Sequence, residues 1–89
     1  MIMQGGGDLG AALYKTWTKS QRRQEITRLV EGYRNGLPVG ILCHMTTLIA
    51  GSKKQARKLL LELLTPEERQ TAVAAAEGGM RPLLEEYLA

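Results

Sequence analysis

The sequence predicts an all-α domain, a compact bundle of five to six short helices, and three observations support this fold class. Residues 26–33 place apolar side chains at i, i+3, i+4 and i+7, the spacing of one helix face. Capping-box patterns, Ser-x-x-Gln at 52–55 and Thr-x-x-Glu at 65–68, mark helix starts. No two segments show strand patterns that could pair into a sheet.

The first part of the chain is a lead followed by two predicted helices. Residues 1–7, which include three consecutive glycines, are expected to be a flexible N-terminal lead, and residues 8–89 a single helical domain. A helix at 8–18 carries an apolar stripe that includes Trp17. A helix at 20–35, capped by Thr18 or Ser20, ends at Asn35-Gly36, since both residues tolerate a left-handed conformation.

The central segment, predicted as a helix over 38–50, is apolar on nearly all sides and should be buried. Pro38 suits the first helical position. The β-branched residues of 41–49 also favour a strand. We prefer the helix, because no second strand exists for this segment to pair with.

Three further helices are predicted at 52–64, 66–77 and 81–88. Thr65, Pro66 and Glu68 form a strong start signal for the second of these. Its small apolar face around Ala72–Ala76 permits close approach of another helix.

Composition suggests self-association. The 89 residues are 44% apolar but include only four aromatic side chains and no Phe, so the core is thin. We therefore expect a homodimer to which the C-terminal half contributes.

The net charge of +3 is unevenly distributed. Residues 1–60 hold ten Lys/Arg and three Asp/Glu, a balance of +7, whereas residues 61–89 hold two and six, a balance of −4. Such asymmetry favours an anionic partner for the basic part. Segregated solvated faces are the alternative explanation.

Cofactor, metal and enzymatic chemistry find no support in the sequence. Cys43 is the single cysteine, which fits a cytoplasmic setting and excludes a multi-cysteine metal site. Cys43 and His44 are adjacent and would diverge on a helix, so they are not expected to form a catalytic pair. The longest apolar run, 37–50, is too short to span a membrane.

The segment 52–64 carries the candidate site. It combines an apolar stripe with a basic face at i, i+1, i+4 and i+5. The basic residues are Lys53, Lys54, Arg57 and Lys58. An ordinary amphipathic surface helix would look the same.

Residues 41–63 resemble helix-turn-helix DNA-binding regulators of bacterial and phage type. In that motif Gly51 supplies the turn and the second helix is the recognition helix. The family usually has its turn glycine one position earlier, at Ala50, and a small residue where this chain has Thr46. The resemblance implies that Gln55 reads a base edge while the four cations meet phosphates of double-stranded DNA.

A second basic group precedes or lies within the helix at 20–35 and would extend the DNA-binding surface if it faced the same way. It consists of Lys15, Lys19, Arg22, Arg23 and Arg28. The sequence thus predicts a small DNA-binding transcriptional regulator. The alternative is a helical adaptor or inhibitor, of the kind that phage- or plasmid-like mobile elements encode, acting on an acidic protein or through a partner groove.

Overall fold

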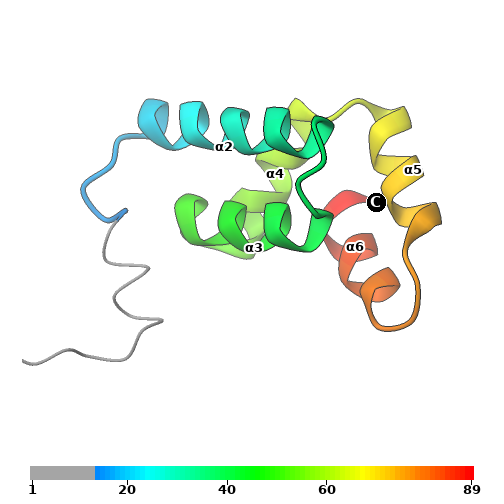
Figure 1. The fold of residues 1–89 in the computed structure, drawn as a ribbon. Helices are drawn as coiled ribbons and strands as arrows, with labels where there is room; N and C mark the ends of the chain where they lie inside the picture. Colours follow the sequence, from blue (N-terminus) through cyan, green and yellow to red (C-terminus); the bar gives the residue numbers. More distant parts are fainter. Residues whose placement is uncertain (1–13) are drawn as a thin grey trace, which may run out of the picture.

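Five helices follow one another in the computed structural model, which describes residues 14–89 (Figure 1). That part of the chain contains no strand, so the all-α prediction is confirmed. The helices are α2 (Lys19–Arg34), α3 (Val39–Ala50), α4 (Lys53–Leu63), α5 (Pro66–Ala75) and α6 (Met80–Leu88). The predicted flexible lead, residues 1–7, lies outside the described residues.

The prediction of a helix at 8–18 is wrong for residues 14–18, the part of this range that the structure describes. Residues 14–16 form a turn, which Trp17 N closes by donating to Tyr14 O at 3.2 Å. The rings of these two residues meet edge to face, with centroids 4.8 Å apart. Residues 8–13 lie outside the described part of the chain.

Capping residues in the local sequence explain where α2 begins and ends. Thr18, not Ser20, is the N-cap, and it exchanges two hydrogen bonds with Gln21 in a reciprocal capping box. Asn35 is the C-cap, and Gly36 follows with a φ of 117° that few other residues adopt.

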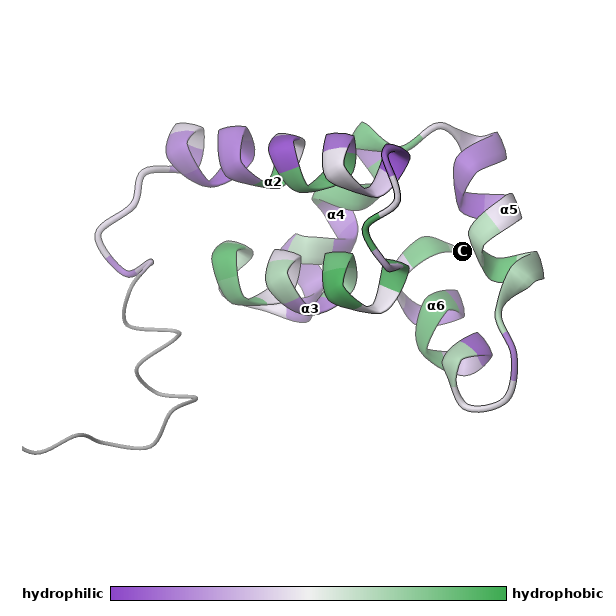
Figure 2. Cartoon of the chain, in the orientation of Figure 1, coloured by the Kyte–Doolittle hydropathy of each residue, from purple (hydrophilic) through white to green (hydrophobic). Residues whose placement is uncertain are grey.

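The ambiguous segment is a helix, as preferred over a strand. α3 starts one residue later than predicted, because Pro38 is its N-cap and not its first helical residue. It ends at Gly51, whose φ of 94° is a left-handed C-cap. Figure 2 shows α3 as strongly hydrophobic and the first turns of α2 as hydrophilic.

The core forms where α2, α3 and α6 pack around α4. α2 packs on α3 and α4, while α4 also contacts α3 and α6. Large side chains that are at most 2% exposed fill the centre, and they come from all four helices. They are Ile26, Val30, Leu42, Ile49, Leu60, Leu84 and Leu88, and Leu64, the residue that follows α4, joins them. Tyr87 adds a polar contact, because its hydroxyl lies 2.7 Å from Thr47 Oγ1 on α3.

The C-terminal half closes the fold on one side of α4. The predicted capping box forms at the start of α5, where Thr65 and Glu68 exchange hydrogen bonds. α5 ends at Ala75, two residues before the predicted boundary, and packs on α6. Among the helices of residues 14–89, none is long and apolar enough to cross a membrane.

Candidate nucleic-acid interface

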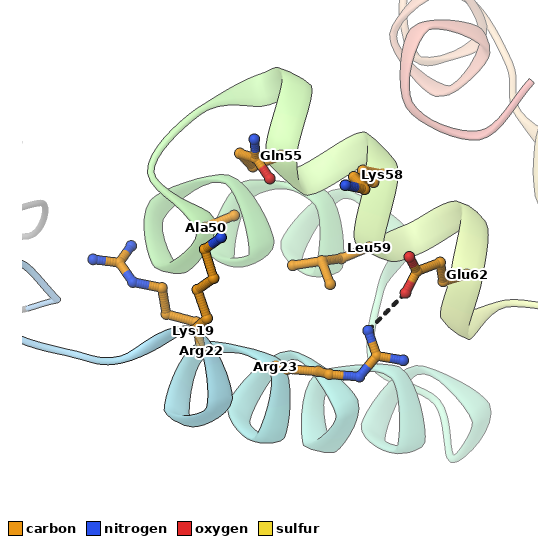
Figure 3. A pocket seen from close by; sticks show the side chains of 8 residues that line it. All are labelled: Lys19, Arg22, Arg23, Ala50, Gln55, Lys58, Leu59 and Glu62. Carbon is orange, nitrogen blue, oxygen red and sulfur yellow. Dashed lines mark hydrogen bonds and ion pairs between the residues drawn. The ribbon is translucent and has the colours of Figure 1, made fainter.

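A basic groove lies between α2 and α4, near the end of α3 (Figure 3). Its volume is about 510 Å³, within the range of ligand-binding clefts. Four cations and one carboxylate line it, which gives a local formal charge of +3. The lining residues are Lys19, Arg22, Arg23, Ala50, Gln55, Lys58, Leu59 and Glu62.

Helical periodicity explains why these side chains converge. Gln55, Lys58, Leu59 and Glu62 stand at i, i+3, i+4 and i+7, so they share one face of α4. The opposing cations come from the first turns of α2, which packs on α4. Three members of the second basic group, Lys19, Arg22 and Arg23, therefore face the same groove as part of the basic helix at 52–64. Arg28 does not line this groove and pairs with Glu25 on α2 itself, while Lys15 is not among the lining residues either.

Arg22 lines the groove, but its guanidinium is engaged with the backbone. Nε donates to Trp17 O at 3.3 Å, Nη1 to Ile49 O and Nη2 to Tyr14 O. The Ile49 carbonyl belongs to the last turn of α3, where a cation also complements the helix dipole. Arg22 thus joins the start of the described chain to the C-terminal end of α3, and it adds positive charge to the groove although three of its five N–H donors are already bonded to the backbone.

Arg23 crosses the groove to α4. Its Nη1 donates to Glu62 Oε2 at 2.6 Å, as the dashed line in Figure 3 shows. This hydrogen bond, followed by the charges of Arg23 and Lys58, lowers the pKa of Glu62. The carboxylate therefore stays ionised and neutralises part of the groove.

Two other cations of the basic helix, Lys53 and Arg57, point to α6 instead of the groove. Lys53 Nζ lies 3.3 Å from the Glu86 carboxylate and 5.9 Å from the centre of the Tyr87 ring. Arg57 donates to the backbone oxygens of Glu86, at 3.1 Å, and of Ala89. Both cations complement the C-terminal end of α6.

Lys54, Gln55 and Lys58 keep their side chains available, since none of the three side chains bonds to another residue within the described part of the chain. All three residues are exposed.

The N-cap of α4 is simpler than predicted. Ser52 Oγ accepts from Gln55 N at 3.2 Å, a single bond in place of the reciprocal box seen at α2 and α5.

Packing between α3 and α4 agrees only in part with the helix-turn-helix alignment. Ile49 and Ala56 are buried where the two helices meet, and Gly51-Ser52 connects them. Thr46 is fully buried, so the position that is usually small in the family is also a core position here. Leu59, in contrast, is half-buried and lines the groove, while Leu60 takes the core position beside it.

Cys43 and His44, the adjacent pair considered for catalysis, lie in different environments. Cys43 is 2% exposed, and burial raises the pKa of its thiol to about 11, whereas His44 is exposed. Within residues 14–89, no three His, Cys, Asp or Glu side chains cluster as a metal site would require.

Glu62 is the groove residue that the sequence interpretation missed. Its position four residues after Lys58 placed it on the same helix face, a signal that was available in the sequence but was not used.

No protein family, curated protein or solved structure matches this chain.

Proposed function

We propose that this chain is a small DNA-binding regulator that holds duplex DNA along the groove between α2 and α4. One observation carries the proposal: two basic segments separated by about 30 residues of sequence meet at one groove of local charge +3. Converging cations are what binding to a phosphate backbone requires. A lone buried thiol accords with action in the cytoplasm.

The proposed roles follow the positions of the side chains. Lys54 and Lys58 on α4, with Lys19 and Arg23 on α2, contact phosphates. Gln55 lies beside them at the exposed start of α4 and contacts a base edge. Arg22, Lys53 and Arg57 act indirectly, because their hydrogen bonds and ion pairs hold the ends of α3 and α6 in place.

Binding of a labelled random-sequence duplex, measured by fluorescence anisotropy over a range of salt concentrations, tests this function. The logarithm of the affinity should fall steeply with the logarithm of salt, by about 0.9 for each phosphate contact. Lys58→Ala should weaken binding and reduce that slope by about one contact. Arg81→Ala, which removes one positive charge from the start of α6, outside this groove, is the matched control and should leave the slope unchanged. Parent affinity that does not depend on salt would contradict the proposal.

A protein-binding adaptor, the second candidate, is favoured by a different surface. A mostly apolar groove of about 590 Å³ lies where the start of α3 meets α5 and α6, lined by Val39, Ala75, Ala76 and Met80 among others. Binding there to a partner helix would depend weakly on salt. We further propose that this groove contributes to a homodimer, since the four helices around the core leave it uncovered.

A further inference from the structure

The basic groove contains a negatively charged side chain of the protein itself, the Glu62 carboxylate. Glu62 Oε2 lies 2.6 Å from Arg23 Nη1. Lys58 precedes Glu62 by one turn of α4, and Lys19 precedes Arg23 by one turn of α2. The Glu62 carboxylate thus lies beside Arg23 of α2 and Lys58 of α4, at the end of the groove away from Lys19 (Figure 3).

The Arg23–Glu62 pair is placed to exchange partners easily. Its side chains are 50% and 46% exposed, although the pair bridges two helices. Solvated pairs of this kind contribute little to stability. The Arg34–Glu68 pair differs, because it is bidentate, at 2.7 and 2.9 Å, and less exposed. Opening the Arg23–Glu62 pair therefore costs the fold little.

We propose that Glu62 occupies a phosphate subsite in the free protein, and that a phosphodiester group of duplex DNA replaces its carboxylate between Arg23 and Lys58. Carboxylate and phosphate oxygens accept the same charge-assisted hydrogen bonds from a guanidinium, so one can substitute for the other. This inference rests on the proposed DNA-binding function. The affinity of the parent protein then includes the cost of displacing its own carboxylate.

The test compares Glu62→Gln with Glu85→Gln in the anisotropy assay, using the full chain and a labelled random-sequence duplex. Both changes raise the net charge by one, but Glu85 is exposed on α6 and lines neither the basic nor the apolar groove. Glu62→Gln should tighten binding about two- to fivefold relative to Glu85→Gln. Its thermal unfolding midpoint should stay within a few degrees of the parent value.

A second comparison asks whether Arg23 itself meets the DNA. Arg23→Ala should weaken binding more in the Glu62→Gln background than in the parent. In the parent, the change removes a phosphate contact but also removes the ion pair that DNA would have to open, so the two effects partly cancel. In the Glu62→Gln background no ion pair exists, so the full loss of the phosphate contact is measured. Unchanged affinity on adding Arg23→Ala to Glu62→Gln would overturn the subsite.

The remaining outcomes separate this inference from the proposed function. Salt-dependent duplex binding with equal affinities for Glu62→Gln and Glu85→Gln overturns the subsite and leaves the function standing. Failure of every variant to bind duplex at low salt overturns both. Competition by inorganic phosphate as effective as that by duplex overturns the assignment to DNA, since a free anion would then fill the site. Equally effective competition by polyglutamate would instead point to an acidic protein.

Discussion

At the scale of single residues, the arginines of this protein act mainly on backbone oxygens and carboxylates of neighbouring helices. Arg22 and Arg57 each bond to the last turn of a helix, α3 and α6 respectively. Arg34 bonds to the Glu68 carboxylate, to Glu31 and to Leu63 O, so it ties the end of α2 to the α4–α5 connection. A side chain that looks like a free cation in the sequence is therefore often part of the scaffold.

Glu68 should make stability sensitive to acid. Hydrogen bonding from Arg34, then from Thr65 N, lowers the pKa of this carboxyl group to about 2, from an ordinary value of about 4.3. Because the folded-state pKa is the lower one, the stabilisation is complete above about pH 4.3 and is lost as the pH falls towards 2. Urea unfolding at several pH values should show this loss in the parent and less of it in Glu68→Gln.

Glu67→Gln is the control for that experiment. It removes the neighbouring carboxylate from the same first turn of α5 but leaves the Arg34 contact intact. An acid-dependent loss of stability in Glu68→Gln equal to that of the parent would show that the Arg34 pair does not contribute.

At the scale of elements, α4 divides its exposed face between two neighbours. Lys53 and Arg57 turn to α6, whereas Gln55, Lys58 and Glu62 turn to α2. Periodicity placed all the cations on one broad face correctly. It could not divide that face, because the division depends on where α2 and α6 pack, and this is set by contacts distant in sequence.

Leu59 and Leu60 show the same limit on the buried side. Both fit the apolar stripe of α4, but Leu60 is fully buried and Leu59 lines the groove. We expect Leu60→Ala to cost about 2–5 kcal/mol of unfolding free energy through the cavity it leaves. Leu59→Ala should cost less, because solvent reaches the vacated space. Chemical denaturation measures both, and equal losses would contradict the burial difference.

Local signals predicted most of the helix boundaries. Caps at Thr18, Ser52 and Thr65 lie three residues from the groups they bond, so sequence alone could place them. The turn at 14–16 was missed because an apolar stripe with Trp17 resembles a helix, and only the long-range bond from Arg22 to Tyr14 O reveals another arrangement.

At the scale of the whole molecule, the basic and acidic halves of the chain partly neutralise each other. Three acids of the C-terminal part, Glu62, Glu68 and Glu86, pair with Arg23, Arg34 and Lys53. The sequence asymmetry therefore overstates the free positive charge. The cations that these contacts leave unpaired include Lys19, Lys54 and Lys58, which lie around the proposed DNA surface.

The apolar groove gives a prediction about assembly. If a second copy covers it, sedimentation equilibrium at micromolar concentration should detect a dimer. Ala75 lines the groove and is exposed, so Ala75→Glu should shift the equilibrium to monomer by burying a charge at the interface. Ala74→Glu, one position away and outside that groove, should remain dimeric. A monomeric parent protein would refute the dimer.

The burial of Cys43 has a practical consequence for measuring motion in this protein. The chain contains one thiol, and that thiol is 2% exposed with its pKa raised to about 11. A thiol reagent can therefore label it only when the core around α3 opens. The labelling rate, divided by that of an unfolded peptide, gives the opening equilibrium of the unmodified protein. Any ligand that prefers the folded state should slow labelling in proportion to its binding.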